Sequence, residues 1–175
     1  MIITVGGQAA SGKTTLAKAL AERLSFRHVS AGQVMRDMAS ERGMSLVDFS
    51  AYAEKHPEVD REIDERQKEI AKGSDCVVDG RLSRYFLNPD LSIWLIAPAD
   101  VRAGRIVGRG ERYASAKEAR EDMILRDDSE RRRYMKYYNI DINDLTAYDL
   151  VINTGRFGIP KMTDISLAAV KSLKQ

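Results

Sequence analysis

The residues best suited to chemistry lie in one run near the N-terminus. The phosphate-binding pattern G-x-x-x-x-G-K-[ST] is matched in full by Gly7-Gln8-Ala9-Ala10-Ser11-Gly12-Lys13-Thr14. In such a loop, successive backbone N–H groups point inward around a polyphosphate, where side chains would be too bulky. We expect Lys13 to neutralise the β- and γ-phosphates of ATP and the Thr14 hydroxyl to ligate Mg²⁺. The structural alternative is a glycine-rich turn with an incidental lysine.

Asp79, which ends a predicted strand, is a second candidate for the metal site. A carboxylate there can hold magnesium through a water molecule. The structural alternative is an aspartate that caps the turn into a helix. The Gly80-Arg81 that follows also puts a guanidinium group near the same edge of the sheet.

Arginines spaced along two predicted helices give another signal. They are Arg102, Arg105 and Arg109 in the first helix, and Arg126 and Arg133, with Glu130 between them, in the second. Arg105 and Arg109 flank an apolar pair and a glycine, which suits a hinged lid that closes over phosphates. Transfer onto a second phosphate brings roughly six negative charges together and needs no general base, because the acceptor oxygen is already anionic. The number of arginines therefore favours a nucleoside monophosphate as acceptor.

An alternation of strands and helices must position these residues. Five short segments rich in Val and Ile are predicted to be buried strands: Ile2–Val5, Arg27–Val29, Cys76–Asp79, Ser92–Ile96 and Leu150–Asn153. They lack strict alternation, as parallel strands covered on both faces do. Charged segments with helical periodicity lie between them, so the pattern predicts an α/β fold with right-handed crossovers.

Two inserts interrupt this alternation. The first, at about 33–72, is too long for one crossover helix; Ser45 caps a predicted helix within it, and Pro57 begins the next. The second, at about 108–121, begins with glycines and continues as a charged helix. We predict a single domain whose core comprises residues 1–32, 73–107 and 122–175.

Composition disfavours several other classes of protein. The 175 residues carry a net charge of only +2, which gives no reason to expect nucleic-acid or membrane binding. The longest apolar run, around Ile93 to Ala99, falls far short of the roughly 18 residues that span a bilayer. The lone Cys76 cannot form an internal disulfide, and the N-terminus has no cleavable apolar leader. We therefore expect a cytoplasmic protein.

With these motifs together, the chain resembles the nucleoside monophosphate kinases, and most specifically the short, archaeal-type cytidylate kinases, over nearly its whole length. Besides the loop, the resemblance rests on His28-Val29-Ser30-Ala31-Gly32, Pro57-Glu58-Val59-Asp60-Arg61-Glu62-Ile63-Asp64, Gly80-Arg81-Leu82, Tyr138-Asn139-Ile140-Asp141 and Tyr148-Asp149-Leu150-Val151-Ile152-Asn153-Thr154. It implies a three-layer P-loop fold with a five-stranded parallel sheet of order 2-3-1-4-5, a helical monophosphate-binding insert and a short lid. The implied activity is Mg²⁺-dependent transfer of the γ-phosphoryl group of ATP to CMP or dCMP, by a monomer.

The resemblance also implies which residues bind the acceptor. Ser30, Gly32 and Arg36 match the Ser/Thr-x-Gly-x-x-x-Arg pattern that begins the monophosphate site, so Arg36 would grip the acceptor phosphate. Arg81 matches an arginine that contacts the same phosphate. Cytosine offers an amino donor beside acceptors, so the candidates for reading it are Asp60, Arg61 and Asp64. For each of these three, a solvated charged helix face is the structural alternative.

On the donor side, Arg105 and Arg109 match arginines at the base of the lid, and Arg126 and Arg133 match arginines that bridge donor and acceptor. The implied catalytic set is Lys13, Arg105, Arg109, Arg126 and Arg133. Beyond the loop itself, the residues matched around ATP are Thr15, Asn153 and Thr154.

Two departures from the family pattern concern the loop. Ala10 replaces a customary glycine, and it would be slightly strained there unless its φ is negative. Lys13-Thr14-Thr15 differs from the Lys-Gly-Thr usual in adenylate kinases, which weighs against AMP as the acceptor.

The sequence also bears on three other classes of protein. An adenylate kinase, or a small P-loop kinase for another acceptor, is the nearest alternative. A regulatory GTPase needs D-x-x-G and N-K-x-D, and neither string occurs in the chain. An RNA-binding module using Arg126–Arg133 is disfavoured by the near-neutral charge and the lack of an aromatic stacking motif.

Overall fold

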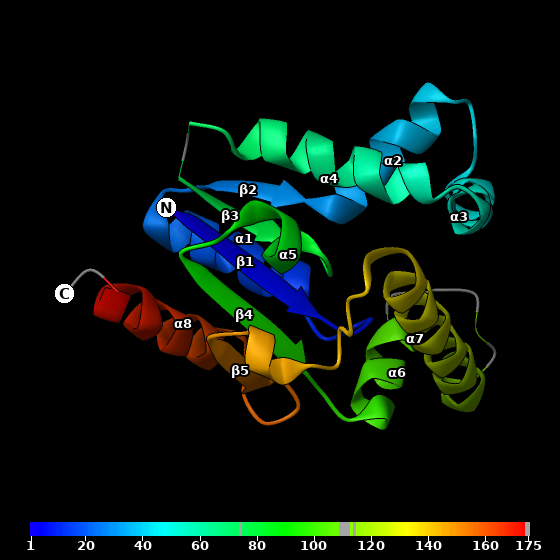
Figure 1. Ribbon diagram of the computed structural model, residues 1–175. Helices are drawn as coiled ribbons and strands as arrows, with labels where there is room; N and C mark the ends of the chain where they lie inside the picture. The colour runs from blue at the N-terminus through cyan, green and yellow to red at the C-terminus, as the bar shows by residue number, and fades with distance from the viewer. Residues whose placement is uncertain (74, 109–112, 114, 174–175) are drawn as a thin grey trace.

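The computed structural model describes residues 1–73, 75–108, 113 and 115–173, which are built around a five-stranded parallel sheet (Figure 1). The strands are β1 (Ile2–Gly7), β2 (Arg27–Ser30), β3 (Cys76–Asp79), β4 (Leu91–Ile96) and β5 (Leu150–Asn153). Their order is β2-β3-β1-β4-β5, and every pair is parallel. All five predicted strands and the predicted order are confirmed. Three strands are longer than predicted: β1 continues to Gly7, β2 continues to Ser30, and β4 begins one residue earlier, at Leu91.

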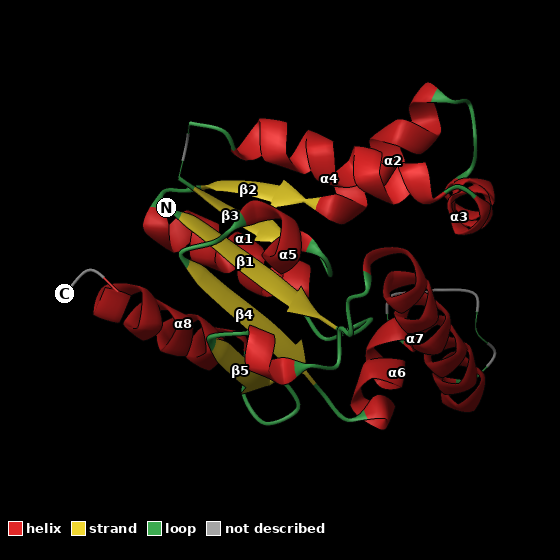
Figure 2. Ribbon diagram, in the orientation of Figure 1, coloured by secondary structure: helices red, strands yellow, loops and turns green. Residues whose placement is uncertain are grey.

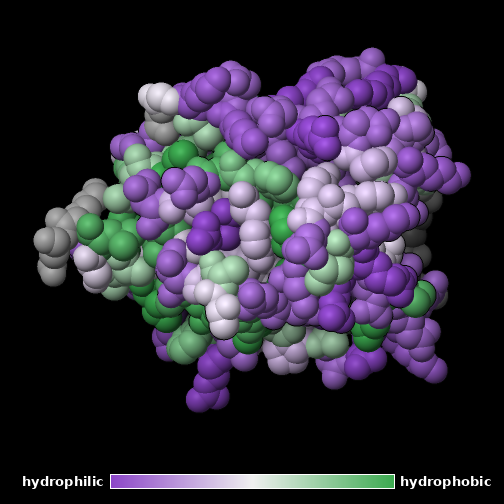
Figure 3. Space-filling view, viewed as in Figure 1, coloured by the Kyte–Doolittle hydropathy of each residue, from purple (hydrophilic) through white to green (hydrophobic). Residues whose placement is uncertain are grey.

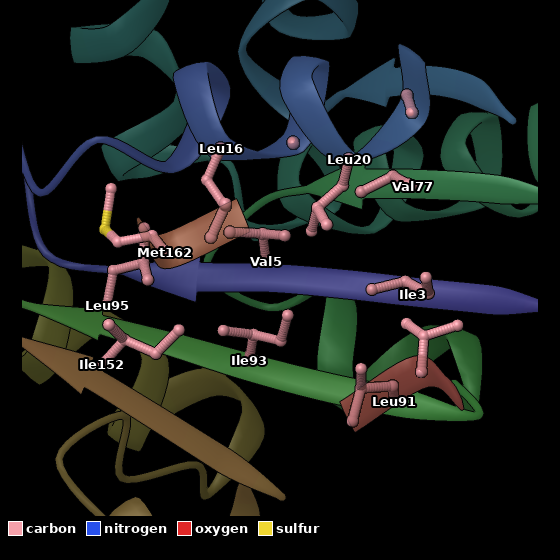
Figure 4. Packing of buried hydrophobic residues seen from close by; sticks show 13 residues of the cluster. Ile3, Val5, Leu16, Leu20, Val77, Leu91, Ile93, Leu95, Ile152 and Met162 are labelled. Atoms are coloured by element: carbon pink, nitrogen blue, oxygen red, sulfur yellow. The ribbon is translucent and has the colours of Figure 1, made fainter. Parts of the chain in front are cut away.

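One face of the sheet is covered by α1 (Lys13–Leu24) and α8 (Ile159–Leu173), as Figures 2 and 4 show. Alternate residues of each strand point to this face. The buried residues labelled in Figure 4 are Ile3, Val5, Leu16, Leu20, Val77, Leu91, Ile93, Leu95, Ile152 and Met162. The predicted inner face of α1 is confirmed, because Leu16 and Leu20 are fully buried and Leu24 packs at the margin.

The other face packs against α5 (Ser83–Leu87) and the segment before β5, which contains the short 3₁₀ helix η1 (Leu145–Ala147). Trp94 is the largest fully buried side chain here, and its ring lies 4.8 Å from that of Tyr148 between centroids. Gly6 lies directly beneath this ring, since a Cβ added there would come within 2.5 Å of Trp94.

Three helices fill the first insert: α2 (Ala31–Glu41), α3 (Leu46–Lys55) and α4 (Pro57–Ala71). They lie together beyond the β2 edge of the sheet (Figure 1) and share an apolar cluster around Met38, Phe49 and Val59. Both predicted helix starts are confirmed. Ser45 caps α3 by accepting a hydrogen bond of 3.1 Å from the Asp48 N–H, and Pro57 is the first residue of α4.

The second insert joins α6 (Ala99–Val107) to α7 (Ala116–Tyr138), which pack along one another. Residues 109–112 and 114, which make up much of the predicted lid, lie outside the described residues. The charged helix predicted after the glycines of this insert is the start of α7, and Ala119 and Met123 pack there against Ala103 and Ile106. The division of the domain into core, insert and lid stays a prediction.

In the view of Figure 3, hydrophilic residues dominate the surface over α2, α3, α4 and α7. Among the described residues, none of the helices is both long enough and apolar enough to cross a membrane.

We expect Gly6→Ala to destabilise the fold by about 1–3 kcal/mol, because its methyl group would overlap the Trp94 ring in a closely packed core. Gly104→Ala in α6 is a matched control, since nothing lies within 4 Å of its added Cβ. In a helix interior that change should be neutral or stabilising by up to about 1 kcal/mol. Urea unfolding of both variants checks this, and an unchanged midpoint for Gly6→Ala would show that the ring can move aside.

Candidate active site

The loop between β1 and α1 has the backbone of a phosphate cradle. Gly7 and Gly12 have φ angles of 146° and 98°, which favour glycine, and a Cβ on Gly7 would lie 2.6 Å from the Leu95 carbonyl oxygen. Ala10 adopts a φ of 55°. This positive φ lies in the left-handed region, which favours glycine, so the strain expected for an alanine at this position is present.

Lys13 begins α1, and its side chain folds back over the loop. Nζ donates hydrogen bonds of 2.9 Å to the carbonyl oxygens of both Gly7 and Gln8. Burial of the ammonium group, with a smaller contribution from the nearby charge of Arg81, lowers the pKa of Lys13 to about 7. Bound phosphates would favour the charged form again.

The predicted metal-binding pair, Thr14 and Asp79, is brought together at the ends of β1 and β3. Thr14 Oγ1 donates a hydrogen bond of 2.8 Å to Asp79 Oδ2, and Ser30 Oγ lies 3.3 Å from the same oxygen. The other carboxylate oxygen, Oδ1, is 2.6 Å from His28 Nε2. His28 is thus a member of this network, a contact that the sequence did not predict.

Two carboxylates of α7 lie against the loop and its nearest arginines. Asp127 accepts a hydrogen bond of 2.6 Å from Arg102 and a longer one of 3.4 Å from the Ala9 N–H. Arg81 reaches Asp127 at 3.5 Å and forms an ion pair with Glu130, one turn further along α7. The predicted phosphate ligand Arg81 is therefore neutralised by protein carboxylates when no phosphate is bound.

Arg105 joins the phosphate loop to the segment after β5. It donates to the carbonyl oxygens of Ala10 and Ser11 at 3.2 and 3.4 Å, and to the hydroxyl and carbonyl oxygens of Thr154 at 2.8 and 2.7 Å. The Thr154 hydroxyl donates in turn to the Ser11 carbonyl oxygen at 2.8 Å. Thr154 is buried by these contacts, whereas the preceding Asn153 stays exposed.

The start of the predicted monophosphate site lies where β2 leads into α2. Ser30 precedes the helix, and Gly32 and Arg36 lie along its first two turns. Arg36 is exposed and donates hydrogen bonds of 3.2 and 2.8 Å to Gln33 Oε1. A Cβ on Gly32 would lie 3.6 Å from Arg36 Nη1, so the guanidinium group stands beside Gly32.

One face of α4 buries two carboxylates, Asp60 and Asp64, which are only 8% and 5% exposed. Arg133 of α7 forms an ion pair with Asp60, with 3.2 Å between Nε and Oδ2. In the part of the chain that the structure describes, Asp64 Oδ2 has no hydrogen-bond partner. Burial, reinforced by the charge of Asp60, raises the pKa of Asp64 to about 8.

A buried amide fixes the second oxygen of Asp64. Gln67 Nε2 lies 3.4 Å from both the Ile63 carbonyl oxygen and Asp64 Oδ1, and Gln67 Oε1 accepts a hydrogen bond of 2.8 Å from Ser83 Oγ. Because the Ile63 carbonyl can only accept, the amide nitrogen must point toward it. Asp64 Oδ1 is therefore an acceptor, and Oδ2 is the oxygen left for a ligand.

Some predicted residues are not brought into these contacts. Arg109 lies outside the described residues. Arg61 is exposed, unlike its neighbour Asp60, and Thr15 is exposed in the first turn of α1. The side chain of Arg126 is 66% exposed and pairs with Glu130 at 3.0 Å.

Several site neighbours carried too weak a sequence signal to be assigned a role. They are His28, Gln67, Ser83, Arg102, Asp127 and Glu130. For Asp127 and Glu130, the signal was a mixture of acidic and basic residues at helical spacing, which equally describes a solvated helix. Only the packing of α7 against the loop distinguishes the two.

Solved structures with the same architecture include two shikimate kinases. The enzyme from Bacteroides thetaiotaomicron has a TM-score of 0.64 at 17% identity, covering 98% of each chain. The enzyme from Aquifex aeolicus has a TM-score of 0.57 at 16% identity, covering 98% of this chain and 97% of that one. An uncharacterised protein from Eubacterium ventriosum has a TM-score of 0.72 at 20% identity, covering 98% and 99%. At these identities the likeness shows the P-loop kinase fold alone.

Sequence relatives are much nearer. A cytidylate kinase from Methanocaldococcus jannaschii is 47% identical over the whole of both chains, and one from Methanobrevibacter smithii is 48% identical over 98% of this chain and 99% of that one. A third, from Archaeoglobus fulgidus, is 45% identical over 99% and 97%. The model of the cytidylate kinase-like family matches residues 2–156. This chain is therefore a member of the cytidylate kinase-like family.

Proposed function

We propose that this protein is a cytidylate kinase, which transfers the γ-phosphoryl group of ATP to CMP or dCMP and yields CDP or dCDP and ADP. The observation that carries the proposal is that Arg81, from the end of β3, lies beside the phosphate loop, because Arg81 and the Ala9 N–H of the loop both contact Asp127 Oδ1, at 3.5 and 3.4 Å. Lys13 would bind the phosphates of ATP, and Arg81 would bind the phosphate of the acceptor. Cations for both groups at one site suit transfer from one phosphate to another. The names of the relatives support CMP as the acceptor.

On the donor side, the loop amides from Gln8 to Thr14 would surround the β- and γ-phosphates, and Lys13 would bind them as the ammonium form. The Thr14 hydroxyl and, through water, Asp79 would hold Mg²⁺, and their 2.8 Å hydrogen bond supports this assignment. When bound, Mg²⁺ neutralises phosphate charge and aligns the transferred group. Arg105 and Thr154 would keep the loop in its binding geometry, beside the adenine site at Asn153.

On the acceptor side, Arg36 and Arg81 would bind the monophosphate. Arg81 is paired with Asp127 and Glu130 in this structure, so the incoming phosphate would replace protein carboxylates as its partner. Arg133, together with Arg126 and Arg109, would offset charge as the phosphoryl group moves. The phosphate oxygen attacks as an anion, and this chain need not supply a general base.

Asp64 is the residue best placed to read cytosine. Among the described residues its buried Oδ2 has no partner, and the ionised carboxylate would accept a hydrogen bond from the exocyclic amino group of cytosine, which uracil lacks. Binding of that donor would favour the ionised form of Asp64 over the protonated one. Asp60 lies one turn away on the same face, whereas the exposure of Arg61 gives it less support. The monomeric state and the cytoplasmic location stay predictions.

A panel of monophosphates tests the substrate assignment. With ATP and Mg²⁺, we expect ADP formation to be fastest with CMP or dCMP, slower with UMP and slowest with AMP. Turnover of AMP equal to or better than that of CMP would contradict the proposal and favour an adenylate kinase.

Proton uptake tests the role of Lys13. At about pH 8 the free amine is mostly uncharged, because its pKa is about 7, and bound phosphates should raise that pKa. Binding of ADP with Mg²⁺ should therefore take up a fraction of a proton approaching one, and this uptake should shrink toward about pH 6, where Lys13 is already charged. Calorimetry in buffers of different ionisation enthalpy measures the uptake.

In the same measurement, Lys13→Met should abolish the uptake and most of the activity. Lys18→Met, which changes an exposed lysine of the same helix, should leave both unchanged. Equal uptake by the Lys13→Met variant would remove Lys13 from the phosphate site.

Asp64→Asn should separate stability from substrate binding. Asp64 has a raised pKa, so its buried carboxyl lowers the stability of the fold as the pH rises from about 4 to about 8, and the amide should recover about 1–3 kcal/mol at pH 8. The same change should raise the KM for CMP and leave the KM for ATP unchanged. Glu65→Gln, on the exposed side of α4, is the control for both measurements. A less stable variant with an unchanged KM for CMP would mean that Asp64 is structural.

A further inference from the structure

His28 lies in the edge strand of the sheet, and its ring contacts a buried carboxylate. It lies in β2, next to Val77 of β3 in the strand register, and Ser30 lies next to Asp79. The imidazole spans two residues along the strand pair, so that Nε2 is 2.6 Å from Asp79 Oδ1. The side chain of Asp79 is only 6% exposed, whereas that of His28 is 21% exposed.

The contacts of Asp79 divide between its two oxygens. Oδ2 accepts from Thr14 Oγ1 at 2.8 Å and lies 3.3 Å from Ser30 Oγ, whereas Oδ1 faces His28. An ionised carboxylate can only accept hydrogen bonds, so His28 Nε2 must be the donor. This contact fixes the rotation of the carboxylate group and turns Oδ2 toward Thr14.

The orientation of Asp79 determines what the Thr14 hydroxyl can do. A hydroxyl has one proton and two lone pairs. Because its proton is directed at Asp79, the lone pairs of Thr14 are left free to face a cation on the opposite side. Oxygen ligands held in this way suit Mg²⁺, and groups that orient metal ligands strongly affect metal affinity.

We propose that His28 is a positioning residue for the nucleotide-bound magnesium ion and acts through Asp79 and Thr14. The proposal rests on the donor half of the proposed function, since it requires Mg²⁺ at the phosphate loop, but it does not depend on which nucleotide is the acceptor. A purely structural role, in which His28 only joins β2 to β3, makes a different prediction, because the metal affinity of the folded protein would then be unaffected.

Metal binding measured without turnover tests the proposal. Mn²⁺ replaces Mg²⁺ as the probe, and the free ion is counted by electron paramagnetic resonance in the presence of saturating ADP. We expect His28→Ala to weaken Mn²⁺ binding about 10–100-fold, the range found when a group that orients metal ligands is removed. Affinity for ADP without metal, measured by calorimetry, should remain unchanged.

Two further variants keep the test valid if His28→Ala folds poorly. The amide nitrogen of His28→Gln reaches about as far as Nε2 and should restore most of the Mn²⁺ affinity, whereas the shorter His28→Asn should not. His56→Ala is the control, because this histidine is more exposed and pairs with Glu58 at the start of α4, not with a residue of the phosphate loop or its metal site. It should bind Mn²⁺ as the unaltered protein does.

Mn²⁺ affinities of His28→Ala and His28→Asn equal to that of His56→Ala would overturn the proposal, whatever happens to their thermal stability. Equal weakening in His28→Gln and His28→Asn would also overturn it, because a donor at the Nε2 position would then have no effect. Failure of the unaltered protein to retain Mn²⁺ with ADP would overturn the donor assignment together with this inference. Failure to phosphorylate CMP would affect the proposed function alone.

Discussion

Parallel pairing of β1 with β3 determines where the charges of the site meet. Because the two strands run in the same direction and are hydrogen-bonded neighbours, the loop after β1 and the residues after β3 emerge at one edge of the sheet. Lys13 and Thr14 arrive there from one strand, and Asp79 and Arg81 from the other. The third strand in this part of the sheet, β2, adds His28 and Ser30 on the far side of Asp79. An antiparallel β3 would have placed the carboxylate at the opposite end of the molecule.

The positive charges gathered at this edge are balanced by carboxylates from helices outside the sheet. Asp127 and Glu130 come from α7, and Asp60, which pairs with Arg133, comes from α4. Buried arginines without partners would cost several kcal/mol each, so the protein without nucleotide needs these acidic residues. These ion pairs also weaken the binding of ligands, because a phosphate has to displace a carboxylate from the arginine that it binds. A dianionic phosphate is better suited to win that competition than a neutral hydroxyl substrate.

Most of the fold and the centre of the site could be predicted from the sequence, because both depend on local patterns. The strands follow from short apolar runs, and the meeting of Thr14 with Asp79 follows from parallel strand order. The partners of the arginines could not be predicted, since the acidic residues of α7 look the same whether they face solvent or Arg81. The burial of Asp64 was equally hidden, because its position on a charged helix gave no indication of which face packs inward.

The strand order also has a consequence for how the chain folds during synthesis. The central strand β1 leaves the ribosome before the other strands of the sheet, and its partners begin only at Cys76 and Leu91. Until these segments emerge, β1 has no neighbour, and its apolar side chains need protection from aggregation. The helices α2, α3 and α4 differ, because they share an apolar cluster of their own and can begin to pack earlier. Assembly of the phosphate loop against Leu95 is therefore a late event, and nucleotide can stabilise the protein only after most of the sheet exists.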